Sequence, residues 1–210
     1  MILDLLRKSW QVAVGSRERA VCYRYEPARQ GTGKRDPAIQ VFDSGTPPPA
    51  GIRRQMTALA GRLGYWEMWR RTARHGGKLL CLLDGSQVVA YGWTQGWAPF
   101  RRRYGWLAQE AVMLGPYWTA PAHRGRGLYG RLLAHSIAVC NERDDMPLLI
   151  MTSQENRASQ RGIHKAGFRQ IAAFERANWF FRLINTHRAV AWESTVGEGG
   201  SKTPPAGRAG

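Results

Sequence analysis

A glycine-rich segment near the middle of the chain has the composition of a phosphate-binding turn. Residues 125–130, GRGLYG, match the G-x-G-x-x-G spacing of dinucleotide-binding turns. The apolar periodicity that follows predicts a helix from about Arg126 to Asn141. The first backbone N–H groups of a helix have no partner within it, so they can bind a pyrophosphate, and glycines let the anion approach the main chain. Arg124 and Arg126 would add charge-assisted contacts.

A dinucleotide site would also need an acidic residue after the next strand, to hold a ribose hydroxyl. Asp144 and Asp145 precede the apolar segment 147–153, which predicts a buried strand, so they lie at its wrong end. Glu155 follows that strand and is the remaining candidate. One further helix and a few strands are too little for the second half of such a fold. A nicotinamide oxidoreductase that binds NAD is therefore the alternative interpretation.

The elements that must position this turn follow from hydrophobic periodicity and turn residues. Asp84-Gly85 between two apolar segments predicts a β-hairpin. Segment 108–120 predicts a long strand, and Gly115-Pro116 inside it requires an edge or a bulge because proline cannot donate to the ladder. The antiparallel strands in the middle of the chain do not fit a doubly wound sheet. The other predicted elements are strands at 20–26, 147–153, 168–176 and 188–193, and helices at 52–74, 126–141 and 155–167.

Length and charge restrict the class of ligand. The chain of 210 residues suits one domain, which we expect to span residues 1–193, followed by a disordered tail at 194–210. There are 31 Lys and Arg against 15 Asp and Glu, a net charge of +16, which favours anionic ligands such as phosphorylated cofactors, anionic sugars or nucleic acid. Zinc-finger and RNP signatures are absent from the sequence, so we expect nucleic-acid binding to be weak and unspecific.

Cysteine usage and hydropathy indicate a cytoplasmic protein. Cys22, Cys81 and Cys140 lie far apart without C-x-x-C spacing, which argues against a disulfide framework and against a metal site. Charged residues at positions 4, 7 and 8 interrupt the N-terminal apolar segment, so we expect no signal peptide. No segment reaches the roughly 18 apolar residues that a membrane span requires.

Segment 119–133, TAPAHRGRGLYGRLL, resembles the acyl-CoA-binding motif of the GCN5-related N-acetyltransferases, the GNAT superfamily. That motif is Arg or Gln, two residues, Gly, one residue, and then Gly or Ala. Arg124, Gly127 and Tyr129 occupy its three defining positions, and Tyr129 departs from the small residue of the pattern. Segment 155–169, ENRASQRGIHKAGFR, is similar to the family's Asn-x-x-Ser stretch with its Lys-x-Gly-Phe ending. The resemblance covers residues 78–174.

The resemblance implies an α/β fold with a mixed, mostly antiparallel central sheet, flanked by helices and splayed at the acyl-CoA site. It also implies acetyl-CoA as acyl donor, with the pyrophosphate at the glycine turn and the pantetheine arm paired with the backbone of residues 113–119. Asn156 would reach the cofactor or cap the short helix, and both roles stay open. The residues expected to bind the cofactor are Trp118, Thr119, Arg124, Gly125, Arg126, Gly127, Leu128, Tyr129, Asn156 and Ser159.

The same resemblance implies an N-acetyltransferase in which a neutral amine attacks the thioester directly. Many relatives place a glutamate where this chain has Gly115, and a tyrosine where it has Ile163. Glu110, earlier on the predicted strand, is therefore the candidate catalytic base, acting through water. Tyr117 is the candidate catalytic proton donor, and Tyr129 is a second phenol to consider.

The acceptor is expected to be a small-molecule amine, with amino sugars and anionic amines as candidates, and the protein to be a monomer or a homodimer. The basic, aromatic segment 93–106, WTQGWAPFRRRYGW, could stack on a sugar nucleotide or nucleic acid, or form a solvated hairpin tip with its aromatic side chains packed on the sheet. Two further alternatives are a nucleic-acid-binding module and a GNAT protein that binds acyl-CoA without transferring the acyl group.

Overall fold

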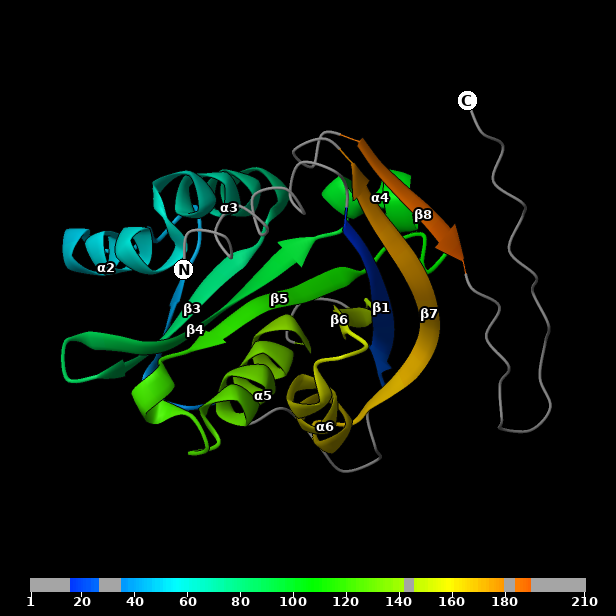
Figure 1. The fold of residues 1–210 in the computed structure, drawn as a ribbon. Coiled ribbons are helices and arrows are strands. Elements are labelled where there is room, and N and C mark those ends of the chain that lie inside the picture. The colour runs from blue at the N-terminus through cyan, green and yellow to red at the C-terminus, as the bar shows by residue number, and fades with distance from the viewer. Residues whose placement is uncertain (1–15, 27–34, 142–145, 180–183, 190–210) are drawn as a thin grey trace, which may run out of the picture.

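The computed structural model describes residues 16–26, 35–141, 146–179 and 184–189. Strands and helices follow one another along the chain in nearly the predicted order (Figure 1). The elements are β1 (Ser16–Tyr25), β2 (Ile39–Phe42), α2 (Ala50–Ala60), α3 (Arg62–His75), β3 (Lys78–Asp84), β4 (Gln87–Gly96), α4 (Ala98–Tyr104), β5 (Val112–Thr119), a 3₁₀ turn (Pro121–His123), α5 (Leu128–Asn141), β6 (Leu148–Ser153), α6 (Arg157–Lys165), β7 (Phe168–Trp179) and β8 (Ile184–Ala189).

One mixed sheet forms the centre of the protein, with the strand order β2-β3-β4-β5-β6-β1-β7-β8. Neighbouring strands are antiparallel except β5 and β6, which run parallel. The expected α/β fold with a mostly antiparallel sheet is therefore confirmed. The predicted hairpin is formed by β3 and β4, but Asp84 still pairs with Gln87, so the turn is Gly85-Ser86, one residue later than expected.

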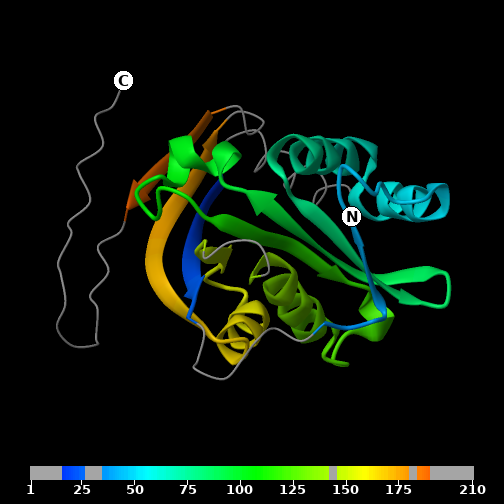
Figure 2. The same ribbon diagram turned by 180° about the vertical axis from the view of Figure 1, so that it is seen from behind.

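Helices cover both faces of the sheet (Figures 1 and 2). On one face, Leu133 of α5 and Ile163 of α6 pack in one apolar cluster with Ile150 of β6. On the other face, Met56 of α2 packs in a cluster with Trp93 of β4. Helix α4 lies over the same face as α2 and α3, farther along the sheet (Figure 1). The sheet therefore separates an α5–α6 face from an α2–α3–α4 face.

The single helix predicted for residues 52–74 is two helices. Gly61 ends α2 and precedes α3 with a φ of +76°, a conformation that a right-handed helix cannot contain. The break changes the helical phase, so apolar residues after Gly61 do not continue the buried face of α2. Tyr65 is buried, whereas Leu63 is 81% exposed and Trp66 is 59% exposed.

The basic, aromatic segment also differs from its prediction, because residues 98–104 form helix α4 rather than a solvated hairpin tip. Trp97 and Tyr104 are buried in one cluster with Phe174 of β7. The three consecutive arginines 101–103 are exposed. The aromatic side chains thus pack on the sheet, which favours a structural role over stacking on a ligand.

Several boundaries are decided by pairing between strands. The edge strand β2, four residues long, was not predicted, since it is too short to show a period. Strand β8 begins at Ile184 instead of residue 188. Residues 190–193 and the predicted tail at 194–210 lie outside the described residues, so the domain boundary stays a prediction.

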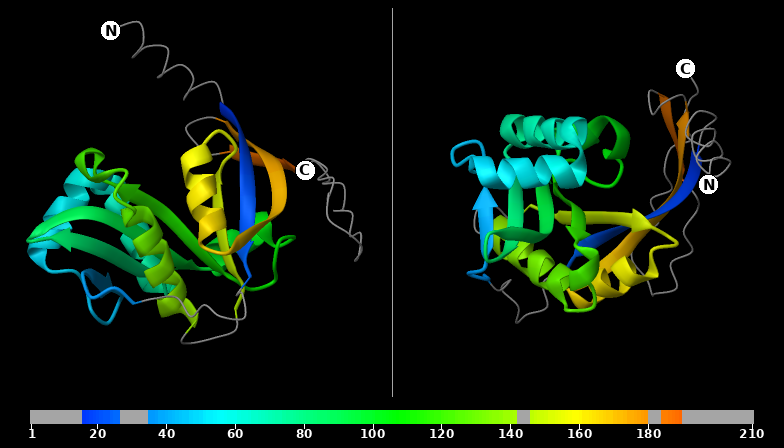
Figure 3. Two further views of the ribbon diagram at one scale, coloured as in Figure 1. Left: turned by 90° about the horizontal axis from the view of Figure 1, so that it is seen from below. Right: turned by 60° about the vertical axis from the view of Figure 1, so that its left-hand side comes forward.

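Strand β5 contains the predicted bulge and then leaves β6. Tyr117 pairs with Gly92 and Leu114 with Thr94, so Gly115 and Pro116 together face a single residue of β4. β5 and β6 pair only over residues 112–114 and 148–150. Beyond these residues the two parts of the sheet diverge (Figure 3). The splayed sheet that the family resemblance implied is present.

No helix in the part of the chain that the structure describes is both long and apolar enough to span a membrane.

Candidate active site

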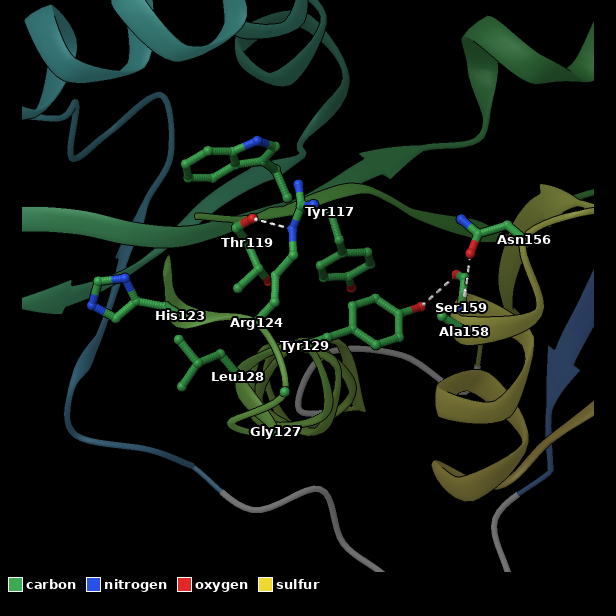
Figure 4. Close-up of a pocket in the computed structure, with 12 residues that line it drawn as sticks. Tyr117, Thr119, His123, Arg124, Gly127, Leu128, Tyr129, Asn156, Ala158 and Ser159 are labelled. Atoms are coloured by element: carbon green, nitrogen blue, oxygen red, sulfur yellow. Dashed lines mark hydrogen bonds between the residues drawn. The ribbon is translucent and has the colours of Figure 1, made fainter. Parts of the chain in front are cut away.

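A pocket of about 500 Å³ lies where β5 and β6 separate. Its walls come from the end of β5, the turn before α5, the first turn of α5 and the start of α6 (Figure 4). It contains all of the predicted cofactor-binding residues except Arg126. The lining residues are Tyr117, Trp118, Thr119, His123, Arg124, Gly125, Gly127, Leu128, Tyr129, Asn156, Ala158 and Ser159.

The turn before α5 has the geometry of an anion-binding site. Gly125 and Gly127 have φ values of +77° and +74°, and a Cβ at either position would meet no atom within 4 Å. Helix α5 begins at Leu128, and its first turn leaves N–H groups without helical partners. Successive N–H groups in such a left-handed turn converge on one point, where the helix dipole adds partial positive charge.

Two arginines flank this turn. Arg124 Nε donates to the Thr119 carbonyl oxygen at 3.3 Å, which holds the side chain along the pocket wall. Arg126 is exposed and does not line the pocket. Neither guanidinium has an ion pair with a described residue, so their charge is available to an anion.

Helix α5 is held in place by the segment before β2. Arg131 Nε donates to Asp36 Oδ2 at 2.7 Å, and the backbone N–H of Asp36 donates to His135 Nδ1 at 2.8 Å. The hydrogen bond from Arg131 is the largest cause that lowers the pKa of Asp36 below its usual value. These contacts position the helix that carries the glycine turn.

On the α6 side, the Asn156 Oδ1 accepts a hydrogen bond from the Ser159 N–H at 3.0 Å, so the predicted N-cap role of Asn156 is confirmed. The Ser159 hydroxyl lies 3.3 Å from the Tyr129 hydroxyl, and this contact joins α5 to α6 across the pocket (Figure 4). Gly162 makes room for the ring, because a Cβ there would come within 2.6 Å of Tyr129. The large residue in the motif is thus matched by a glycine on the facing helix.

Tyr117 lines the pocket from β5. Its hydroxyl donates to Ser136 Oγ at 2.9 Å, and its ring meets Tyr129 edge to face, with centroids 5.4 Å apart. Burial raises the pKa of Tyr117 strongly and also raises the pKa of Tyr129. Both phenols are therefore neutral at pH 7.

Glu110 lies away from this group. Strand β5 begins at Val112, so Glu110 belongs to the preceding loop and not to the strand as predicted. Its side chain is 54% exposed and forms an ion pair with Arg101. It does not line the pocket. The role of Glu110 as a base acting through water stays a prediction.

The end of β5 directs some of its backbone groups away from β4 and into the pocket. Ala120 N–H donates to the Val89 carbonyl oxygen at 2.8 Å. Because backbone groups alternate in direction along a strand, those of Tyr117 and Thr119 point away from β4, toward the gap left by β6. The bond from Arg124 to the Thr119 oxygen agrees with this direction.

Two lining residues were not predicted. His123 is the last residue of the 3₁₀ turn, and its Nε2 lies 3.6 Å from Asp84 Oδ2 at the end of β3. Ala158 lies between the two predicted residues of α6. The sequence could have predicted His123 as a lining residue from its position next to Arg124 in the motif. A small apolar residue such as Ala158 has no sequence feature that would predict a place in the pocket.

Comparison with known proteins identifies the family. The acetyltransferase (GNAT) family pattern matches residues 51–168. No curated protein matches the chain significantly. A GNAT-family protein from Novosphingobium aromaticivorans superposes with a TM-score of 0.57 at 20% identity, over 77% of this chain and 63% of its own.

Two further solved structures have the same fold. A GCN5-related N-acetyltransferase from Sphaerobacter thermophilus has a TM-score of 0.52 at 16% identity, over 83% of this chain and 56% of its own. A GCN5-related N-acetyltransferase-like protein from Streptococcus suis has a TM-score of 0.54 at 13% identity, over 84% of this chain and 67% of its own. The chain therefore spans about three-fifths of the length of the first two of these three relatives. Since the family pattern covers more than half of the sequence, this chain belongs to the acetyltransferase (GNAT) family.

Proposed function

We propose that this protein transfers an acetyl group from acetyl-CoA to the amine of a small molecule. The observation that carries the proposal is the pocket, in which an anion-binding helix start and a free strand edge lie side by side. The GNAT family uses acetyl-CoA, a molecule with a pyrophosphate at one end of a long pantetheine arm. Each of these two parts has a matching surface in the pocket.

The residues present fit this cofactor. The N–H groups of residues 125–129 and the guanidinium of Arg124 would hold the pyrophosphate, and the open space beside Gly125 and Gly127 admits it. The backbone groups of Tyr117 and the N–H of Thr119 would pair with the amides of the pantetheine arm, as an added strand would, while the Thr119 carbonyl oxygen accepts from Arg124.

Bound acetyl-CoA supplies the acyl carbon, where a C–N bond forms as the C–S bond breaks, so the amine must lose a proton and the thiolate must gain one. We assign the proton donation to Tyr129, with Tyr117 as the other phenol in the pocket. The hydroxyl of Tyr117 is engaged with Ser136 at 2.9 Å, whereas that of Tyr129 has the longer contact of 3.3 Å with Ser159. Turning the Tyr129 hydroxyl toward the thiolate therefore breaks a weaker hydrogen bond than turning the Tyr117 hydroxyl would.

A second candidate function is acyl-CoA binding without transfer. It is favoured by one observation: no carboxylate lines the pocket among the described residues. The nicotinamide alternative has no such support, because Glu155 does not line the pocket either.

The proposed location of the protein is the cytoplasm. The three cysteines are free, and burial raises the pKa of Cys22 and Cys81 to about 12, as suits inert thiols in a reducing cytoplasm. We propose a monomer or a homodimer, with an amino sugar or an anionic amine as the acceptor. Binding to nucleic acid is expected to be unspecific.

The test has two stages. Acetyl-CoA at roughly 100 times its Kd should stabilise the native state by about 2.7 kcal/mol, which raises Tm by about 5–11 °C, whereas NAD should leave Tm unchanged. Incubation with acetyl-CoA and a panel of amines, followed by mass spectrometry, then detects products heavier by one acetyl group. Stabilisation by NAD alone contradicts acetyl-CoA binding, and stabilisation by acetyl-CoA without any product supports the second candidate function.

A further inference from the structure

Gln95 is a buried polar residue at the centre of the sheet. It lies on β4 and is only 6% exposed. Its Nε2 donates to the carbonyl oxygen of Gly115 at 2.6 Å, while its Oε1 is buried and has no hydrogen-bond partner in the described part of the protein. Buried polar atoms in native proteins are nearly always paired. The Oε1 can therefore accept a hydrogen bond from a group that is not among the described residues.

The face of the sheet on which Gln95 lies follows from the strand register. Gln95 pairs with Met113 of β5, which in turn pairs with Leu149 of β6. Side chains paired across strands point to the same face. Met113 and Leu149 belong to the cluster that includes Trp97 beside α4. Gln95 therefore lies on the α2–α3–α4 face, opposite α5 and the glycine turn.

The bond to Gly115 holds the side chain beside the bulge, two residues before Tyr117, which is the first residue of β5 that lines the pocket; Gln95 and Gly115 are not themselves lining residues. Gly115 is part of the bulge at which β5 leaves β6. Two residues later, Tyr117 meets Tyr129 on the α5 face, while Trp118 stacks on Tyr91 on the other face, with centroids 5.5 Å apart. Because Tyr117 and Trp118 both line the pocket, the pocket reaches both faces through the gap.

A cofactor held by α5 therefore occupies one face of this gap, and the other face is left for the acceptor. Gln95 is on that other face, hydrogen-bonded to the residue where the gap begins. The bond from Nε2 to Gly115 fixes the orientation of the Gln95 amide, so the atom left to bind a ligand is Oε1, a hydrogen-bond acceptor. An acceptor oxygen binds an N–H.

We propose that Gln95 Oε1 accepts a hydrogen bond from the attacking amine and positions it, an inference that rests on the proposed acetyl transfer. A primary amine can donate one N–H to this oxygen and keep its lone pair for the acyl carbon. A neutral amide does not take up the proton, so Gln95 is a positioning residue and not the base.

Gln95→Met tests this role, and Gln55→Met is the matched control. Gln55 on α2 has both amide atoms paired with the hairpin: Nε2 donates to the Ser86 oxygen at 2.9 Å, and Oε1 accepts from Val88 N–H at 2.8 Å. The probes are glucosamine, spermidine and tyramine, and kinetics are measured with whichever is acetylated most efficiently. Release of CoA without amine measures hydrolysis, in which water is the acceptor.

Gln95→Met should lower kcat/KM for the amine about tenfold, the loss expected for one hydrogen bond, and leave hydrolysis and the Kd of acetyl-CoA within about twofold. Gln95→Glu keeps an oxygen acceptor, so it should recover most of the loss and add an ionisation to the pH profile of kcat/KM. Gln55→Met should lower Tm and leave the ratio of amine transfer to hydrolysis unchanged.

Three results overturn the inference. Unchanged amine kinetics in Gln95→Met would mean that water or nothing pairs with Oε1. An equal loss of amine transfer, hydrolysis and acetyl-CoA affinity would mean that the side chain only supports β5. Acetyl-CoA binding with no amine acetylated would refute the proposed transfer together with the inference, whereas either of the first two results leaves the transfer standing.

Discussion

Replacing Gly127 by alanine is the most direct test of the phosphate-binding turn. Gly127 has a φ of +74°, and a Cβ there would meet no atom within 4 Å, so the substitution adds backbone strain without a clash. A left-handed conformation costs a residue other than glycine about 1–2 kcal/mol, which lowers Tm by about 2–8 °C in a chain of this size. Since Gly127 lines the pocket, the added methyl group also occupies space beside the expected phosphate.

The affinity for acetyl-CoA should also fall, because the methyl group would keep the phosphate from reaching a backbone N–H of the turn. A hydrogen bond to a charged group contributes about 1.5–3 kcal/mol, so loss of one such bond raises Kd about 10- to 100-fold. Isothermal titration calorimetry measures Kd, and differential scanning calorimetry measures Tm.

The control is Gly76→Ala. Gly76 also has a positive φ, +69°, with nothing within 4 Å of a Cβ, but it caps α3 outside the pocket lining. This variant should lose similar stability and keep its Kd. A folded Gly127→Ala protein with wild-type affinity for acetyl-CoA would refute the assignment of the turn to phosphate.

Arg124→Ala should raise the Kd of acetyl-CoA about 10- to 100-fold in the same titration, because it removes a charge-assisted contact, and unchanged affinity would exclude that contact. Glu110→Gln should leave this Kd unchanged, and if Glu110 is the base, turnover of the acetylated amine falls about 10²–10⁴-fold; full turnover removes it from the mechanism. Tyr129→Phe should lower turnover about 10²-fold, and more than Tyr117→Phe does; the reverse order of the two would return the proton donor to Tyr117. Asp36→Asn should lower Tm at pH 7, because a carboxyl whose folded pKa is lowered contributes stability above its unfolded pKa. This difference should disappear as the pH falls below about 4 and through the folded pKa, and a difference that persists at pH 2 would contradict the role of the charge.

Local features of the sequence determined the parts of the site that depend on few neighbouring residues. Gly125 and Gly127 before an apolar helix predicted a turn open to phosphate, because positive φ is a property of glycine itself. Asn156 predicted a helix start, because an N-cap bonds only three residues ahead. Gly115-Pro116 predicted a bulge, because proline has no N–H for the ladder.

Contacts between residues far apart in the sequence decided the rest. The placement of Glu110 outside the pocket followed from where β5 begins to pair with its neighbours, a boundary that hydrophobic pattern does not define. Tyr129 fits only because Gly162 lies opposite on another helix. The unpaired oxygen of Gln95 depends on Gly115 of the adjacent strand. Sequence patterns report on backbone conformation and on which residues are apolar, whereas the partner of a side chain is set by packing, and only the tertiary structure contains it.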